Sequence, residues 1–366
     1  MRIEWQIAFW LAVLILFGVA GYMFANVLAP FIASLALGYV LDPVVTRLQR
    51  LGLSRLSATL VILAIFLILN AVLIFTLGPI LGRQLVGFAE SLPDYANKLQ
   101  SLIAGEIAHL MQGGDWLKKY GVDLPASAEE LQKTLGGFVG QGTQYLGNFL
   151  RSLWSGGQAL VAIIALVVVT PVVTFYLLVS WPEMVSNLRS LIPPRYRATA
   201  FTLAGEIDRA LSGFLRGQSL VCLFLGAWYG VGLTLIGLNF GFFIGISAGF
   251  LSFIPYVGST VALVFSIIVA LVQGWPHLGL LGLALLVVGT GQFLEGNVLS
   301  PKLVGESVGL HPVWLIFALF AFGSLMGFSG MIIAVPLAAA MGVLTRFAVR
   351  RYKQSALFSG IGLDSP

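Results

Sequence analysis

Charged side chains are scarce in this chain. Asp, Glu, Lys and Arg make up 10% of the 366 residues, against about 25% in an ordinary soluble domain. The windows Ile7 to Leu41 and Ala58 to Leu81 contain none of these residues, although the helices of a soluble protein need a polar face. Together with a mean hydropathy of +0.96, this excludes a soluble protein and predicts an integral membrane protein.

The groups that usually carry enzyme chemistry are scarce as well. The single cysteine, Cys222, excludes an internal disulfide. His277 and His311 each flank a proline at a predicted helix boundary and predict no metal pair. No GxxxxGK[ST] motif occurs, which excludes ATP hydrolysis by a P-loop, and the protease-like GFSG at 327–330 lacks a suitably placed histidine. We therefore expect no cofactor and no enzymatic activity.

The distribution of Lys and Arg predicts an orientation. The net charge of +5 comes from residues spread over loops, so it does not indicate a nucleic-acid partner. Cationic residues gather in 47–55, in 182–217 and in the C-terminal tail, whereas acidic and basic residues are nearly balanced in 78–154. Cationic loops favour the cytoplasm, so we expect both termini inside and residues 78–154 outside.

Hydrophobic runs predict an all-α polytopic fold of about eight transmembrane segments. The runs expected to form single helices are Ile7 to Leu28, Phe31 to Val45, Ser57 to Leu77, Ala159 to Trp181, Ser219 to Leu238 and Leu278 to Leu299. Pro30 is expected to open the second run, and Asp42, before Pro43, is expected to be a turn or cap residue. Amphipathic helices are predicted within 78–154 and over 194–216, the latter starting at Pro193-Pro194.

These runs suggest five regions. They are N-terminal transmembrane helices in 1–77, an extracytoplasmic amphipathic arm in 78–154, a transmembrane helix with a cytoplasmic amphipathic helix in 155–217, a transport core in 218–347, and a cytoplasmic tail in 348–366.

One uncharged run, from Phe240 to Gln273, is too long for a single crossing. As one straight helix its 34 residues would measure about 51 Å, beyond a hydrocarbon core of about 30 Å, and two full crossings would need about 40 residues. Pro255 and Gly258 lie near its middle. The run therefore predicts a re-entrant hairpin with arms 240–254 and 259–273.

A second uncharged run is interrupted in the same way. GSLMGFSG at 323–330 separates the arms 311–325 and 331–345. A shift of 72 residues aligns Gly258 with Gly330, and it also aligns Ser252 with Ser324, Val261 with Ile333 and Ala262 with Ala334. The helices that precede the two hairpins should cross in opposite directions, which is typical of inverted-repeat secondary transporters. Alternatively, Pro255 only kinks an ordinary helix pair and the glycines only let helices approach closely.

The breaks define the predicted substrate or ion pathway, because broken backbone at membrane depth needs protein or a wet cavity to satisfy its polar groups. Glu295 is the only acidic residue between Arg216 and Lys302. It is a candidate coupling carboxylate, or a structural residue paired with Lys302. The predicted pathway residues are Pro255, Tyr256, Gly258, Ser259, Gln292, Glu295, Asn297, Ser324, Gly327, Ser329 and Gly330.

Four stretches also resemble a known family. They are APFIASLALGYVLDPVV near the start, FLSFIPYVGS (250–259), QFLEGNVLSPKLVG (292–305) and LHPVWLIFALFAFGSLMGFSGMIIAVPLAA (310–339). In these the chain resembles the autoinducer-2 exporter family of bacterial permease-like proteins. The resemblance implies a multi-pass inner-membrane transporter that forms a homo-oligomer, with a pentamer as one option. It also implies substrates that range from the quorum-sensing furanone signal to Na⁺ or Li⁺ exchanged for protons.

Two functions follow from these observations. In the first, the chain is a secondary transporter, expected to be an exporter, of a small polar solute such as autoinducer-2 or of a monovalent cation, with coupling to H⁺ or Na⁺. A Na⁺(Li⁺)/H⁺ antiporter is a variant of this reading. In the second, the chain is a membrane scaffold without transport activity, whose amphipathic arms assemble a ring.

Overall fold

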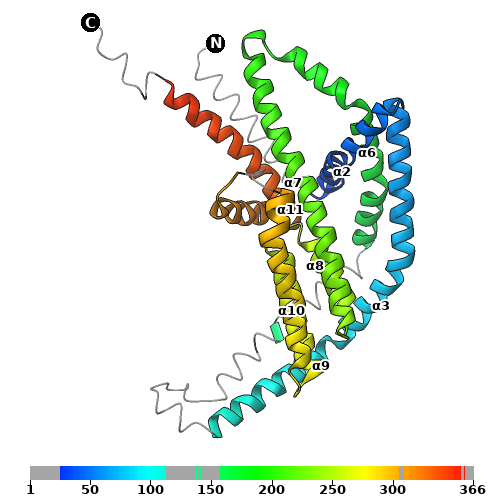
Figure 1. The fold of residues 1–366 in the computed structure, drawn as a ribbon, viewed down its shortest axis with the longest axis vertical. Coiled ribbons are helices and arrows are strands. Elements are labelled where there is room, and N and C mark those ends of the chain that lie inside the picture. The colour runs from blue at the N-terminus through cyan, green and yellow to red at the C-terminus, as the bar shows by residue number, and fades with distance from the viewer. Residues whose placement is uncertain are drawn as a thin grey trace. The chain divides into compact units, whose positions relative to one another are not determined.

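The computed structural model describes residues 25–112, 137, 140–141, 157–304, 309–355 and 358. Its principal elements are α2 (Ala25–Arg50), α3 (Arg55–Gln112), α6 (Gly157–Leu191), α7 (Pro194–Leu235), α8 (Gly241–Leu251), α9 (Val257–Gly274), α10 (Gly279–Leu294), the π-helix η1 (Glu295–Val304) and α11 (Pro312–Lys353) (Figure 1). Over these residues the chain is helical and has no strand. Most of the predicted first helix, Ile7 to Leu28, lies outside them.

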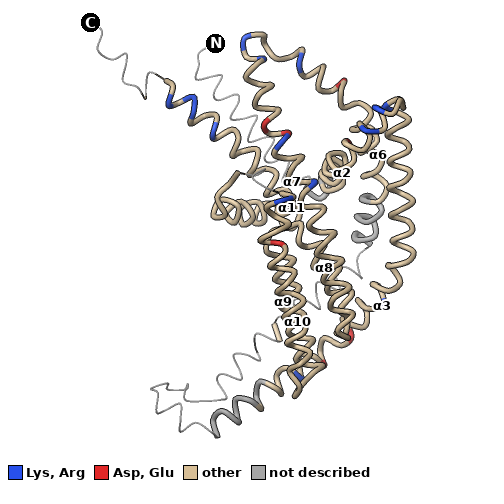
Figure 2. Tube along the Cα trace, viewed as in Figure 1, with Lys and Arg blue, Asp and Glu red and all other residues tan. Residues whose placement is uncertain are grey.

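Seven of the described helices are long and apolar enough to cross a membrane. The helix α8, with 11 residues, is too short to do so. Lys and Arg lie in the last turns of α2 and α11, and α3 and α7 also carry charged residues in their interiors (Figure 2). The prediction of an all-α integral membrane protein is therefore confirmed.

Several predicted helix boundaries are wrong. The helix α2 continues through Pro30 and Pro43, so Asp42 lies inside a helix and does not cap one. The helix α3 continues past residue 77 through Pro79 and Pro93. The predicted amphipathic segment 194–216 and the following apolar run form the single helix α7, although its predicted start at Pro194 is confirmed.

Arginine side chains explain two of the tolerated prolines. Proline has no N–H, so it leaves the carbonyl four residues earlier without its helical donor. Pro43 frees the carbonyl of Tyr39, which accepts a hydrogen bond from Arg216 Nε at 2.8 Å. Pro182 frees the carbonyl of Leu178, which accepts from Arg55 Nε at 2.6 Å. The helices continue because another segment supplies the missing donor.

The described residues fall into two compact units. Unit 1 takes its residues from 1–69, 163–221 and 296–366, and unit 2 takes its residues from 70–162 and 222–295. In unit 1, Val45, Ala58, Ile62 and Leu178 form a hydrophobic core. Arg55 pairs with Asp42 at 2.9 Å beside this core.

In unit 2, α8 lies directly on α7 through glycines. A Cβ atom at Gly245 or Gly249 of α8 would overlap the backbone of Gly230 or Gly226 of α7, respectively. A third α8 glycine, Gly241, lies against the backbone of Leu233. Glycines at four-residue spacing allow two helix backbones to touch. The alternative expectation that glycines bring helices close together is therefore correct for this contact.

Side chains of α3 and α9 hold the start of α8. Gln84 of α3 accepts a hydrogen bond from the Phe243 N–H at 2.8 Å and so satisfies a donor in the first turn of α8. Gln273 at the end of α9 accepts from the Asn239 N–H at 2.8 Å and donates to the Gly237 carbonyl at 2.8 Å. Gln273 thus joins the end of α9 to the loop before α8 and closes the open end of the first hairpin.

Candidate functional site

The first predicted hairpin is confirmed as a helix–turn–helix. The helices α8 and α9 pack against each other, and the chain reverses over residues 252–256. Pro255 frees the carbonyl of Leu251, which accepts from the Ile254 N–H at 3.0 Å within the turn. Tyr256 then adopts a left-handed backbone conformation, with φ 69° and ψ −24°, and α9 starts.

Four predicted pathway residues meet at this turn, with different surroundings. Tyr256 is 57% exposed, whereas Ser259 is 8% exposed and donates to the Tyr256 carbonyl at 3.2 Å. A Cβ at Gly258 would overlap Ser252 Oγ and the Ala248 carbonyl of α8. Pro255 and Gly258 therefore shape the turn, and the Tyr256 side chain is the accessible group.

The second predicted hairpin lies within α11. Gly327 has φ 61° and ψ −140°, which interrupts the helix. A Cβ at Gly330 would overlap the carbonyl of Phe322, eight residues earlier, and a Cβ at Gly323 would touch Met331. In a straight helix residues eight apart lie about 12 Å apart, so the chain doubles back here. The predicted break is confirmed and is centred on Gly327.

The polar residues of the second turn are also in place. Ser324 is exposed and donates to the Ala321 carbonyl at 2.9 Å, and Ser329 is half-buried. Their hydroxyls therefore lie at the break itself.

Each hairpin has its own buried stripe of small residues. The stripe in α9 consists of Gly258, Ala262 and Ser266. The stripe in α11, 72 residues later, consists of Gly330, Ala334 and Ala338. All six are buried, and their four-residue spacing places each stripe on one face of its helix. Each hairpin thus turns a small-residue face of its second arm inward. The two stripes thus add structural support to the sequence alignment of the two hairpins at a shift of 72 residues.

Glu295 lies where α10 changes into the π-helix η1. Residues 295–304, which include Gly296 and Pro301, have the wider π geometry. Such segments occur frequently at functional sites. Gln292 and Asn297 are exposed and Glu295 is half-buried. In the described part of the chain, no ion pair joins Glu295 to Lys302.

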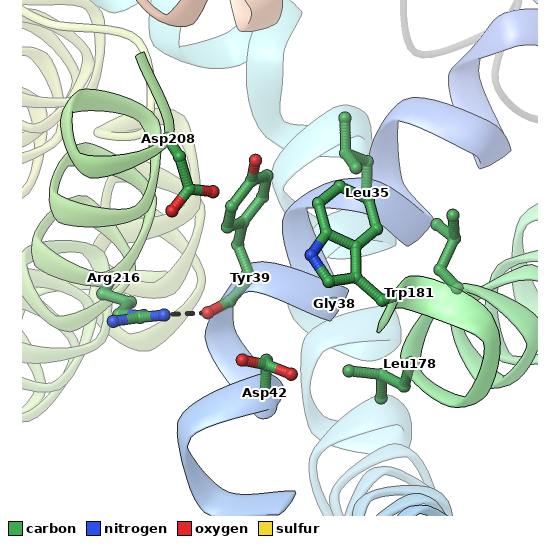
Figure 3. Close-up of a pocket in the computed structure, with 9 residues that line it drawn as sticks. Leu35, Gly38, Tyr39, Asp42, Leu178, Trp181, Asp208 and Arg216 are labelled. Carbon is green, nitrogen blue, oxygen red and sulfur yellow. Dashed lines mark hydrogen bonds between the residues drawn. The ribbon is translucent and has the colours of Figure 1, made fainter. Parts of the chain in front are cut away.

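A cavity in unit 1 was not predicted. It has a volume of about 100 Å³ and lies between α2, α6 and α7 (Figure 3). Its polar lining includes Asp42, Asp208, Arg216 and Tyr39, with Trp181 and Leu35 among the other lining residues. Arg216 donates to the Tyr39 carbonyl at its edge. The sequence around Asp42 predicts a turn or cap residue and no cavity.

Among the residues that the structure describes, no three His, Cys, Asp or Glu side chains lie close enough together to hold a metal ion. His311 instead begins α11, where its Nδ1 accepts from the Val313 N–H at 3.4 Å. This agrees with its predicted position at a helix boundary.

Comparison with known proteins gives a consistent assignment. Residues 11–350 match the model of the AI-2E family transporters. YueF of Bacillus subtilis, named as a candidate transport protein, is 30% identical over 88% of this chain and 85% of its own length. PerM of Escherichia coli K12, named as a candidate permease, is 30% identical over 87% of this chain and 86% of its own length. YrrI of B. subtilis, also named as a candidate transport protein, is 26% identical over 93% of this chain. The chain therefore belongs to the AI-2E family of transporters, which supports a role in transport across the membrane.

Proposed function

We propose that this protein is a secondary transporter, and that the turn of each helical hairpin lines a substrate or ion pathway. The observation that carries the proposal is one arrangement that occurs twice, with the breaks 71 residues apart and the small-residue stripes 72 residues apart. Each hairpin has a break with positive φ, at Tyr256 and at Gly327, followed by a buried stripe of small residues. Paired interrupted segments of this kind mark the binding site in inverted-repeat transporters.

The conformation of the first turn supports this role. A bulky residue in the left-handed region costs about 1–3 kcal/mol and persists only where the surrounding structure enforces it, often at functional sites. Tyr256 is such a residue, and its side chain is exposed. Within a membrane, groups of a broken backbone are stable only in protein or beside a water-filled cavity. We therefore place the turns beside a hydrated pathway.

The candidate solute is small and polar. Hydroxyl groups and carbonyls suit a polyhydroxylated solute, such as the autoinducer-2 signal, or a monovalent cation. Glu295, with Gln292 and Asn297 nearby in the sequence, would couple export to H⁺ or Na⁺, because an ionisable group within a membrane segment is a functional candidate. A Na⁺(Li⁺)/H⁺ antiporter uses the same groups with the cation as the transported species.

The distribution of charges supports a proposal for the position in the cell. Arg47 and Arg50 end α2, Arg189 ends α6, and Arg350, Arg351 and Lys353 end α11. By the positive-inside rule these ends face the cytoplasm. We therefore propose a bacterial inner-membrane protein with cytoplasmic termini.

A membrane scaffold is the second candidate. It is favoured by the apolar side chains that α3 exposes, among them Leu60, Ile65, Ile68, Ile74 and Phe75. Such a face would pack against lipid or against further copies of the chain in a homo-oligomer, of which a pentamer is one form. Contact with lipid alone accounts for the exposed apolar face of α3. This face is therefore weaker support for a scaffold than the paired helix breaks are for a transporter.

Flux in proteoliposomes tests the proposal. Reconstituted protein should move Na⁺, Li⁺ or autoinducer-2 in response to an imposed pH or Na⁺ gradient, and Glu295→Gln should reduce this flux to the level of empty liposomes. Glu206→Gln is the matched control, since Glu206 pairs with Arg350 at 3.5 Å on a partly exposed surface. Absence of gradient-driven flux with all three solutes would favour the scaffold.

A further inference from the structure

One buried polar group has no partner to explain its burial. The side chain of Tyr229 on α7 is fully buried, and no hydrogen bond to its hydroxyl occurs within the described part of the chain. Burying a hydroxyl without a partner destabilises the folded chain. A phenylalanine would fill the same space without this penalty, so the hydroxyl requires an explanation.

The neighbour of this ring is a glycine of α10. A Cβ atom at Gly291 would overlap Cε1 of Tyr229 and crowd its hydroxyl. Two further contacts fix α7 against α10 at this level: the Trp228 indole donates to the Val287 carbonyl at 3.1 Å, and Gly232 lies against the Val287 side chain. The Tyr229 hydroxyl is thus held at a defined height on α10.

Glu295 lies one turn beyond Gly291 on the same helix face. Its N–H donates to the Gly291 carbonyl, so the α-helical geometry is maintained up to Glu295. Side chains of a helix lean toward its N-terminus, over the preceding turn. Helix geometry therefore gives Glu295 an accessible side-chain orientation over Gly291, toward the Tyr229 hydroxyl. Tyr229 and Cys222, seven residues apart on α7, both lie within electrostatic range of this carboxylate.

We propose that the Tyr229 hydroxyl donates a hydrogen bond to the Glu295 carboxylate when the carboxylate is charged and holds no proton or cation. Tyr229 is then a positioning residue for the coupling group, and this inference rests on the proposed function of Glu295. When Glu295 binds a proton or cation, it turns away and the hydroxyl loses this partner. The donor thus gives the charged carboxylate an orientation that differs from that of the loaded carboxyl group.

Infrared difference spectroscopy of the reconstituted full chain tests this pairing directly. Glu295→Gln identifies the carboxylate and carboxyl bands of Glu295 in the spectrum between high and low pH. Tyr229→Phe removes only the hydroxyl oxygen and should shift the Glu295 carboxylate band while the packing against Gly291 is kept. Gradient-driven flux should fall about tenfold, as expected for the loss of a hydrogen bond to a charged group.

Ser266→Ala is the matched control, because Ser266 on α9 also has a buried hydroxyl with no hydrogen-bond partner among the described residues. It should leave the Glu295 bands unchanged. Glu295 bands that are identical in Tyr229→Phe and the wild type would overturn the pairing, whatever the flux, and would assign the hydroxyl to a buried water molecule. If Glu295→Gln keeps full flux while Tyr229→Phe shifts the band, the pairing stands and the coupling role of Glu295 fails.

Discussion

Prolines have opposite consequences in two regions of the molecule. In α2 and α6, Pro43 and Pro182 leave the helix intact, because arginine side chains bind the carbonyls that they free. At Pro255 the freed carbonyl of Leu251 accepts from Ile254 within a turn, and a new helix begins after Tyr256. At these three prolines the helix continues where a distant arginine binds the freed carbonyl, and it turns where an N–H of the turn binds it.

The largest expected effect on stability concerns the first hairpin, where glycines hold α8 on α7. Gly249→Ala should lower the free energy of unfolding by about 3 kcal/mol or more, because the new Cβ overlaps the Gly226 backbone. Equilibrium unfolding in detergent micelles measures it. Gly282→Ala in α10, with open space around its position, should be neutral or stabilising by up to about 1 kcal/mol. Equal losses in both variants would show that the glycine contact contributes nothing.

The next effect tests arginine compensation in α2. Arg216→Met should cost about 1.5–3 kcal/mol of unfolding free energy, because it leaves the Tyr39 carbonyl without a donor. In a Pro43→Ala background the restored N–H takes over this carbonyl, so the cost should fall by about 1 kcal/mol or more. A double-mutant cycle measured by unfolding gives the coupling. Pro30→Ala, in the same helix, should show no coupling with Arg216→Met, and additive Pro43→Ala and Arg216→Met effects would contradict the explanation.

The smallest effect concerns the left-handed residue at the first turn. Tyr256→Gly should be more stable than Tyr256→Ala by about 1 kcal/mol, because glycine adopts φ 69° without the Cβ penalty. Both variants lose the aromatic side chain, so their difference isolates the backbone strain. Unfolding midpoints in one detergent measure this difference, and identical midpoints would mean that Tyr256 is not strained.

The broken helices could be predicted from the sequence because their cause is local. Length, the absence of charge and the position of Pro255 and Gly258 together exclude a straight helix. The same reasoning failed at Pro43, because its compensating donor, Arg216, is 177 residues from Tyr39. The prediction of a helix end at Pro43 failed because the two hydrogen-bond partners are far apart in the sequence.

The site was predictable in part for the same reason. Tyr256 and Gly327 stand at breaks that the sequence marks, and both breaks are found. The cavity beside Tyr39 and Asp208 is lined by three helices that are far apart in the chain, so no local sequence pattern predicts it. The glycines of α8 do show a four-residue spacing, but the chain has 43 glycines, so the spacing alone does not predict a helix contact. The contact is identified only in the structure, where Gly226 and Gly230 of α7 lie against the α8 glycines.

The bare glycine contact between α7 and α8 also has a mechanical consequence. Gly241, Gly245 and Gly249 present main chain to the helix beneath them, and the α8 side chains of Phe242 and Ile246 lie against Gly230 of that helix. These side chains fix the register of the two helices. The shortest arm of the first hairpin is thereby held in place on its neighbour.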